Sequence, residues 1–341
     1  MGFDAEVWNM VKKGRVSKLS VGGVPILGGG IPVTGGKTFF VNYTNGHDGP
    51  NLGKNIDEPF KTIEYAYTRM TTNKYDVCVL TGNATHPVSA MMNLDKNRCI
   101  FVGLDGANRR YGQGARITMA LTTAATDLGI IKNTGNRNTF YNIKFDSANS
   151  LAESVYSFMD GGEYTYMENC EFYKSTHLTA AAGGNLAAEL LCNGDSSQYV
   201  NCTFGDLVNT RGTGGSCIRP TVLFTRETIT GKVARDVTFT NCQFFVKAAD
   251  TGVACMYAST ATDIERRLIL ERPTFMNAKL GTANPGEAVL AAAAQTEGWI
   301  LIIEPSTLDI SAHASASVGA YVTGGSTPLD TTTGIAAIID S

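Results

Sequence analysis

The residues of this chain that could carry out chemistry are thiols, imidazoles and carboxylates. The sequence contains 8 cysteines and 4 histidines. Thiolates and imidazoles bind zinc when they converge at one level of a fold, often from closely spaced pairs. No two cysteines form a Cys-x-x-Cys pair, and the histidines are scattered. We therefore predict no metal site, and we expect free, buried thiols in a reducing compartment.

The carboxylates are a second group that could support catalysis. Asp146, Asp160 and Glu163 could converge near one turn, with Arg211 or Arg219 beside them. Such an arrangement would provide an acid and a base next to a cation. Acidic residues in turns are most simply solvated, however, and the sequence contains no Walker loop, Gly-x-Ser-x-Gly or His-Glu-x-x-His motif. We predict no catalytic residue and no cofactor.

Asparagine and cysteine recur together in a short phrase. Asn-Cys-x-Phe begins at Asn169, Asn201 and Asn241, and a degenerate copy, Asn-Ile-Lys-Phe, begins at Asn142. Around each copy, apolar and polar residues alternate as in a strand with one buried face. A constant phrase with spacers of different length is typical of a solenoid with variable loops.

This phrase predicts scaffold rather than an active site. If the copies stack in a parallel sheet, the cysteines and the phenylalanines form inward columns. The asparagines then lie at the bend between two strands, where Asn tolerates a left-handed conformation and its amide can bond to the next rung. The fold class is therefore all-β, a right-handed parallel β-helix. The predicted columns are Asn142, Asn169, Asn201 and Asn241; Cys170, Cys202 and Cys242; and Phe145, Phe172, Phe204 and Phe244.

Composition agrees with a single long solenoid. The chain has 341 residues, of which 17% are charged, and its formal net charge is -3. This charge provides no basic field for nucleic acid, so we expect no nucleic-acid partner. No apolar run approaches the roughly 20 residues that span a bilayer. The N-terminus lacks the pattern of a secretory signal peptide, so we expect neither export nor membrane insertion.

We predict three parts in the chain. Residues 1–36 form an extended N-terminal arm, residues 37–310 form the β-helix with a capping helix at about 59–71, and residues 311–341 form closing rungs or a cap. The arm carries apolar residues that it cannot bury by itself. It either folds back on the first rungs or docks on a partner or a symmetry mate. The residues expected to bind are Trp8, Val11, Val24, Ile26 and Leu27.

The N-terminal part of the solenoid resembles a known superfamily. A strand at 37–42, a Pro-Phe-x-Thr-Ile helix start within 58–66, a buried strand at 76–80 and a Gly-containing rung at 100–104 follow one another. This order resembles the first unit of pectin-lyase-like β-helix proteins, in which the helix covers the open end of the solenoid. With the Asn-Cys-x-Phe rungs, the resemblance covers roughly residues 37–308.

That superfamily contains polysaccharide lyases and hydrolases, so the resemblance also implies where a site would be sought. A polysaccharide hydrolase of this type needs clustered Asp on adjacent rungs beside a cation. The usual motifs Asn-Thr-Asp, Asp-Asp, Gly-His-Gly and Arg-Ile-Lys are absent, and the nearest approach is Gly46-His47-Asp48. Glu168 and Glu171 have no acidic counterparts in the next rungs. We therefore expect a protein that is not an enzyme.

The chain is also similar to bacteriophage virion proteins of the pectin-lyase-like type. The similarity lies in the opening at 37–46, the arm and the missing catalytic motifs. It implies a non-enzymatic, capsid-decorating or head-associated virion protein, made in the host cytoplasm. We expect a homotrimer whose arm binds other virion proteins, with the major capsid protein as the expected partner. The alternatives are a tail fibre or spike that binds or cleaves a host glycan, and a polysaccharide lyase or hydrolase.

Overall fold

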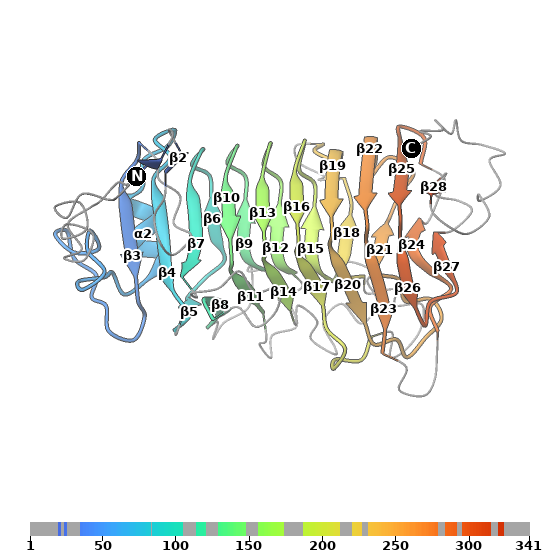
Figure 1. Ribbon diagram of the computed structural model, residues 1–341, viewed down its shortest axis with the longest axis horizontal. Coiled ribbons are helices and arrows are strands. Elements are labelled where there is room, and N and C mark those ends of the chain that lie inside the picture. The colour runs from blue at the N-terminus through green and yellow to red at the C-terminus, as the bar shows by residue number, and fades with distance from the viewer. Residues whose placement is uncertain are drawn as a thin grey trace.

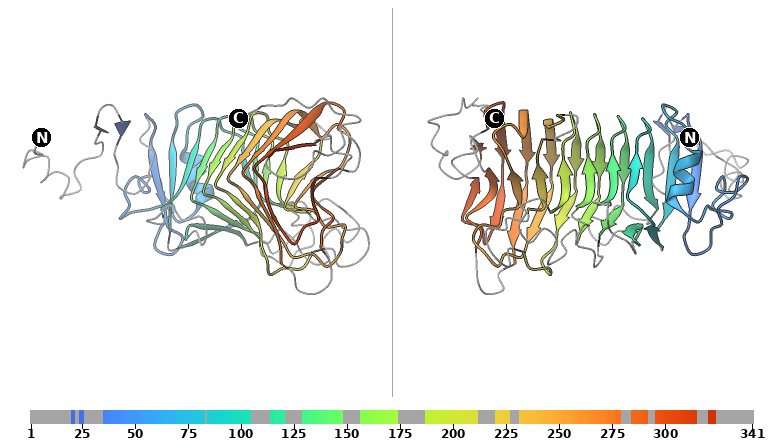
Figure 2. Two further views of the ribbon diagram at one scale, coloured as in Figure 1. Left: turned by 45° about the vertical axis from the view of Figure 1, so that its right-hand side comes forward. Right: turned by 180° about the vertical axis from the view of Figure 1, so that it is seen from behind.

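The chain repeats a rung of three short strands, because alternating apolar residues need one buried face and frequent turns interrupt each run. The computed structural model describes residues 20–21, 24–25, 35–82, 84–104, 114–120, 129–147, 156–173, 187–211, 220–226, 231–278, 284–291, 295–314 and 320–323. The strands stack into three parallel sheets along one axis (Figure 1). Seen obliquely, the sheets enclose a common core (Figure 2).

Sheet A is the longest, with 10 strands. Its strands are β3 (Thr38–Val41), β4 (Val77–Thr81), β7 (Ile100–Leu104), β10 (Thr139–Tyr141), β13 (Tyr166–Glu168), β16 (Gln198–Val200), β19 (Ala234–Thr240), β22 (Ile264–Glu271), β25 (Gly298–Ile303) and β28 (Ala320–Thr323).

Sheets B and C have 8 strands each. Sheet B contains β5 (Thr85–Val88), β8 (Arg116–Met119), β11 (Lys144–Asp146), β14 (Glu171–Tyr173), β17 (Thr203–Gly205), β20 (Gln243–Val246), β23 (Thr274–Asn277) and β26 (Ser306–Leu308). Sheet C contains β6 (Met92–Leu94), β9 (Gly129–Asn133), β12 (Tyr156–Asp160), β15 (Ala188–Cys192), β18 (Val222–Phe224), β21 (Met256–Ala258), β24 (Glu287–Ala291) and β27 (Ala312–Ala314).

The chain passes from sheet A to B to C and back to A in each full rung, which defines an A/B, a B/C and a C/A corner. The pairings within these sheets are parallel and in register; Phe145, Phe172, Phe204, Phe244 and Phe275 occupy equivalent positions of sheet B. The prediction of an all-β parallel β-helix is confirmed.

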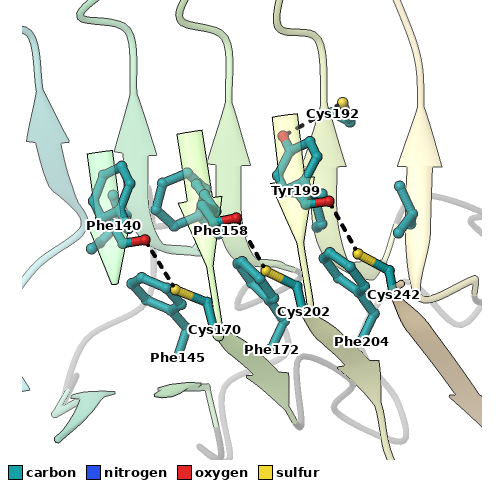
Figure 3. Packing of buried hydrophobic residues seen from close by; sticks show 14 of the residues in the cluster. Phe140, Phe145, Phe158, Cys170, Phe172, Cys192, Tyr199, Cys202, Phe204 and Cys242 are labelled. Carbon is teal, nitrogen blue, oxygen red and sulfur yellow. Dashed lines mark hydrogen bonds between the residues drawn. The ribbon is translucent and has the colours of Figure 1, made fainter. Parts of the chain in front are cut away.

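The interior consists of stacked side-chain columns (Figure 3). The rings of Phe172 and Phe204 are parallel, with centroids 4.8 Å apart, and Phe204 stacks on Phe244 at 5.2 Å. Beside them, the thiol of Cys170 donates to the carbonyl of Phe140 at 3.6 Å, and the thiol of Cys242 donates to the carbonyl of Tyr199 at 3.3 Å. Stacked rings contribute about 0.5–1.5 kcal/mol per pair beyond their buried area, so these columns join each rung to the next.

The asparagines lie at the A/B corner, where the backbone is left-handed. Their φ angles are 56° at Asn142, 53° at Asn169, 52° at Asn201 and 53° at Asn241. Their backbone N–H groups donate to carbonyls of the following rung, as from Asn201 to Thr240 at 2.9 Å. The amide of Asn169 donates to Oδ1 of Asn142 at 3.3 Å, so in this pair its acceptor is a side chain rather than the backbone that we expected.

One helix lies at the N-terminal end of the described solenoid. Helix α2 (Ile63–Arg69) begins after Thr62, whose Oγ1 accepts from the backbone N–H of Tyr65 at 3.2 Å. Its buried side chains are Ile63, Ala66 and Tyr67, and it contacts β3, β4 and β5. The helix is shorter than the predicted span of about 59–71, because Pro59 and Phe60 belong to the preceding loop.

The predicted arm lies almost entirely outside the described residues. Within it, β1 (Ser20–Val21) and β2 (Val24–Pro25) pair antiparallel. Trp8, Val11, Ile26 and Leu27 lie outside the described residues, and of Val24 only the backbone is described. The predicted contacts of the arm therefore stay a prediction. No helix in the described part of the chain is long and apolar enough to cross a membrane.

Candidate functional site

The outer face of sheet B presents two columns of side chains, because every second residue of a strand points away from the core. One column is polar along its whole length. It comprises Thr85, Arg116, Lys144, Glu171, Thr203, Gln243, Thr274 and Ser306. The other column is apolar in its last rungs. It comprises Pro87, Thr118, Asp146, Tyr173, Gly205, Phe245, Met276 and Leu308.

A hollow of about 280 Å³ lies where Gly205 interrupts the second column, between Tyr173 and Phe245. Gly205 has a φ of 82°, and a Cβ there would collide with the backbone oxygen of Phe245. The position therefore requires glycine, and the hollow lies beside it, lined by both rings. The other lining residues are Lys144, Glu171, Phe172, Thr203, Asp206, Leu207 and Val208.

Two ion pairs cross neighbouring strands beside this hollow. Nζ of Lys144 lies 3.3 Å from Oε2 of Glu171 and 4.3 Å from the ring centroid of Tyr173. Nη1 of Arg116 lies 3.4 Å from Oδ2 of Asp146. Both carboxylates are largely buried, with side-chain exposures of 9% for Glu171 and 6% for Asp146. They are thus held in place and partly desolvated, which strengthens their electrostatic interactions.

The negative charges around this hollow affect the pKa of the Tyr173 hydroxyl. Burial raises the pKa of Tyr173, and three nearby carboxylates raise it further. These are Asp206, Asp146 and Glu171. The hydroxyl therefore stays protonated at neutral pH and can donate a hydrogen bond.

Asp206 holds the loop that forms one wall of the hollow. Its Oδ1 accepts from the backbone N–H groups of Val208 at 2.7 Å and Asn209 at 2.6 Å, and its Oδ2 accepts from Nδ2 of Asn209 at 2.9 Å. This is an Asx turn, in which an aspartate bonds to backbone groups two and three residues later. Asp206 therefore orders the loop and adds a negative charge to the site.

Two polar atoms of the first column have no partner in the described protein. Oγ1 of Thr203 and Oε1 of Gln243 are buried and make no hydrogen bond to the described residues. The two residues are neighbours in register on β17 and β20, and Thr203 lines the hollow. A buried polar atom without a partner costs about 1–3 kcal/mol, so this part of the column is under-satisfied next to the hollow.

An ion pair is buried beneath the same loop, at the B/C corner. The guanidinium of Arg211 donates to Oε1 of Glu189 and, at 3.3 Å, to the carbonyl of Pro220. Both side chains are completely buried. Burial raises the pKa of Glu189, and the neighbouring charge of Arg211 opposes this shift. Because Arg211 also packs against Gly205, the pair supports the floor of the hollow.

The acidic residues singled out from the sequence do not converge. Asp146 lies on the outer face of sheet B, whereas Asp160 ends β12 at the C/A corner. There Asp160 is buried and accepts hydrogen bonds from Ser197 at 2.8 Å and Tyr199 at 2.6 Å, so it fixes the corner from inside. Glu163 accepts from Nδ2 of Asn136 at 3.4 Å.

The cations proposed to accompany those acids lie elsewhere. Arg211 pairs with Glu189, and Arg219 lies outside the described residues. Sequence reasoning missed Tyr173, Phe245 and Gly205, because a lone glycine between two outward rings becomes visible only when the strand register is known. Within the described ranges, no group of three or more His, Cys, Asp or Glu side chains could hold a metal ion.

The sequence matches no known protein-family profile and no curated protein. A solved structure of the pectin methylesterase from Aspergillus niger matches with a TM-score of 0.55 at 12% identity, covering 89% of this chain and 92% of that enzyme. The chain has the fold of a pectin methylesterase. Pectate lyase Pel9A matches with a TM-score of 0.42 at 12% identity, over 83% of this chain and 80% of that one. A Geobacillus virus E2 protein, ORF18, matches with a TM-score of 0.41 at 10% identity, over 77% of this chain and 56% of that protein.

These comparisons correct one expectation. We expected a protein that is not an enzyme, and this is contradicted because two solved structures that share the fold over 89% of this chain, with TM-scores of 0.55 and 0.53, are of a pectin methylesterase. The missing sequence motifs were poor grounds for that expectation, since the same architecture supports several chemistries through different side chains. The pectin-lyase-like fold itself is confirmed.

Proposed function

We propose that this protein is a carbohydrate-active β-helix protein that binds a polysaccharide on the outer face of sheet B and cleaves it there. The observation that carries the proposal is the slot beside Gly205, which is lined by Tyr173 and Phe245 and bordered by carboxylates. A sugar ring has an apolar C–H face and a rim of hydroxyl groups. The two aromatic rings suit the first, and the polar column suits the second.

The carboxylates Asp146 and Glu171 supply the chemistry that this proposal needs. They lie on neighbouring strands, two positions apart in register. With about 4.8 Å between strands and about 3.3 Å per residue, their Cα atoms are about 8 Å apart. Inverting glycoside hydrolases hold two carboxyl groups about 6.5–9.5 Å apart, which leaves room for a water molecule, and two outward side chains on Cα atoms about 8 Å apart can meet that spacing.

Such a hydrolysis requires opposite roles for the two groups. One carboxyl group protonates the leaving oxygen as the glycosidic bond breaks. The other carboxylate takes a proton from the water whose oxygen bonds to the anomeric carbon. Lys144 and Arg116, which pair with Glu171 and Asp146, hold both carboxyl groups in place and offset their charge.

The test is to incubate the purified protein with a panel of bacterial capsular and cell-wall polysaccharides and to measure new reducing ends and retained binding. We expect Glu171→Gln and Asp146→Asn each to lower cleavage at least about a hundredfold, the lower end of general acid–base effects, while binding persists. Tyr173→Ala should weaken binding itself.

Matched controls come from sheet A of the same rung. Glu168 and Tyr166 lie on β13, outside the hollow, and the Tyr166 hydroxyl donates to Glu168 at 3.0 Å. Glu168→Gln and Tyr166→Ala should leave binding and cleavage unchanged. Equal losses in both sets of variants, or no bound polysaccharide in the panel, would reject the proposal.

We also propose that the protein acts as part of a bacteriophage particle, as a tail fibre or spike with a host glycan as ligand. Its support is the resemblance of residues 37–46 to phage structural proteins and the glycan site described above. Attachment through the arm and a homotrimeric state remain predictions. Mass spectrometry of purified particles and light scattering of the isolated protein test them, and a protein absent from particles would rule out this location.

A further inference from the structure

A second exposed surface lies at the C/A corner, opposite sheet B. Here each rung bends through a residue with left-handed backbone, as at the A/B corner. The φ angles are 56° at Tyr75, 57° at Arg98, 59° at Arg137 and 56° at Tyr164. We call these four residues the Tyr–Arg stripe.

Backbone hydrogen bonds fix the stripe in register. The N–H of Arg98 donates to the carbonyl of Asn136 at 2.9 Å, and the N–H of Arg137 donates to that of Glu163 at 2.7 Å. Each acceptor immediately precedes the stripe residue of the next rung. The four side chains therefore start from equivalent positions of successive rungs, about 4.8 Å apart, and the whole stripe spans about 14 Å.

The local conformation does not account for these residue types. A left-handed backbone costs an ordinary side chain about 1–2 kcal/mol, and Asn or Gly avoids much of that cost. The A/B corner uses Asn at this point in four rungs, followed by Arg272 and Glu304 in the next two. Large residues held in unfavourable conformations cluster at functional sites, and Tyr75 and Tyr164 are 43% and 52% exposed.

The two arginines of the stripe lie against aromatic rings rather than carboxylates. The guanidinium carbon of Arg98 is 5.6 Å from the ring centroid of Tyr75, and that of Arg137 is 4.9 Å from the ring centroid of Tyr164. Among the described residues, no carboxylate forms an ion pair with either arginine. In addition, Nε of Arg98 is buried without a hydrogen-bond partner in the described part of the chain.

We infer that the Tyr–Arg stripe binds an acidic polysaccharide, with its carboxylate or sulfate groups on Arg98 and Arg137 and its sugar rings on the tyrosines. Two adjacent guanidinium groups repel each other unless an anion lies between them, and their planar N–H groups match carboxylate and sulfate oxygens. The outer tyrosines offer flat apolar surfaces at both ends. The inference rests on the proposed function only in taking the ligand to be a polysaccharide.

The experiment measures binding of the full-length protein to hyaluronate, dextran sulfate, neutral dextran and oligothymidylate at low and high ionic strength. We expect binding to the two acidic polysaccharides, weakened by salt, and none to dextran. The double variant Arg98→Gln/Arg137→Gln should lower that affinity at least about tenfold. Arg98→Lys/Arg137→Lys should retain part of it, because the charges remain but the planar donors are lost.

Arg266→Gln is the matched control, since Arg266 is also exposed and left-handed at this corner but pairs with Asp236 at 2.9 Å. It should change affinity less than about twofold. Equal affinity of the double variant and the wild type, or of Arg98→Gln/Arg137→Gln and Arg266→Gln, would overturn the inference. Tighter binding of oligothymidylate, lost in the double variant, would instead assign the stripe to single-stranded nucleic acid.

The variants of sheet B separate this inference from the proposed function. If Tyr173→Ala abolishes all binding of acidic polysaccharide and the arginine variants do not, the stripe is rejected and the sheet B site stands. If the stripe binds but no variant of sheet B affects any polysaccharide, the proposed function fails and the stripe stands.

Discussion

The A/B and C/A corners solve the same backbone problem with different residues. Both bend through a left-handed residue whose N–H bonds to the next rung. At the A/B corner Asn169 and three equivalent asparagines satisfy the bend with a small amide, and Arg272 and Glu304 replace them in the last two rungs. At the C/A corner Tyr164 and Arg137 occupy the bend with large exposed groups. The difference teaches that a repeated position is scaffold where its residue suits the bend, and a candidate surface where it does not.

A second contrast lies within the C/A corner itself. In the later rungs, Arg235 pairs with Asp195 and Glu265, and Asp236 pairs with Arg266 and Arg267. These charges compensate one another. In the earlier rungs, Arg98 and Arg137 form no ion pair with a described carboxylate, so their guanidinium charges are not compensated in this way.

The largest effect should come from the columns behind the A/B corner. Phe172→Ala would remove a completely buried ring stacked between Phe145 and Phe204, and we expect a loss of about 3–5 kcal/mol in the free energy of unfolding. Urea denaturation measures it. Val208→Ala, at a side chain that is 67% exposed, is the control and should cost less than about 0.5 kcal/mol. Similar losses for both would contradict the view of this column as scaffold.

Variants of the Glu189–Arg211 pair at the B/C corner test whether a buried ion pair contributes to folding stability. Arg211→Met would leave Glu189 buried without its cation, with an expected loss of about 3–5 kcal/mol at neutral pH. Adding Glu189→Leu should recover much of it, because neither charge then remains. An equal or larger loss in the double variant would show that packing, not charge, decides stability at this corner.

The loss of stability in Arg211→Met should depend on pH, in a direction set by the pKa of Glu189. Burial raises the pKa of Glu189 in the folded state, so folding favours its protonated form. The stability lost in Arg211→Met should therefore be smallest below the pKa of an unfolded Glu, about 4.3, and should grow as the pH rises through the folded pKa. Unfolding curves of the variant and the wild type across this window measure the difference, and a difference that does not vary with pH would contradict a role for the Glu189 charge.

A smaller effect should follow from the bend residue of the A/B corner. Asn169→Ala removes the amide bond to Asn142 and places a Cβ-bearing residue without a local partner at a φ of 53°. We expect a loss of about 1–2 kcal/mol. Asn169→Gly tolerates the same φ and should cost less, which thermal unfolding can show. If the Gly variant lost more, the amide contacts rather than the conformation would dominate.

The smallest change in stability is expected at the C/A corner. Tyr164→Asn exchanges a large residue at a φ of 56° for one that tolerates it, while losing the contact with Arg137. Relief of the left-handed conformation gains about 1 kcal/mol and loss of the cation–π contact costs about 0.5–1 kcal/mol, so the two effects should nearly cancel in the melting temperature. A large destabilisation would show that the stripe is scaffold as well, and the contrast between the corners would fail.

The architecture could be predicted from the sequence because each copy of the repeat specifies which residues point inward, which point outward and which lie at the bend. Asn169-Cys170-Glu171-Phe172 specifies a bend, an inward thiol, an outward carboxylate and an inward ring, and the later copies agree with it. Parallel stacking follows once such copies must bury the same face. The segment 270–275 lacks the Asn-Cys pair but ends in a phenylalanine in the same register, since Phe275 stacks on Phe244 at 5.2 Å.

The candidate site could not be predicted from the sequence in the same way. Tyr173, Gly205 and Phe245 belong to three different rungs, and loops of unequal length separate them, so no fixed spacing marks them. Glu189 and Arg211 likewise meet across a corner. The sequence provides even less indication of the Tyr–Arg stripe, because its residues are unusual only in their left-handed φ angles, which are known only from the folded chain.

The register of the three sheets has a consequence for the length of the molecule. Each inner strand pairs with the equivalent strand of the preceding rung and of the following rung in its sheet. Duplication of one complete turn would therefore repeat existing contacts, leave both ends as they are and lengthen the solenoid by about 4.8 Å. Sites on its faces would move apart by the same increment, so this fold lets the distance between two binding surfaces be adjusted in whole steps.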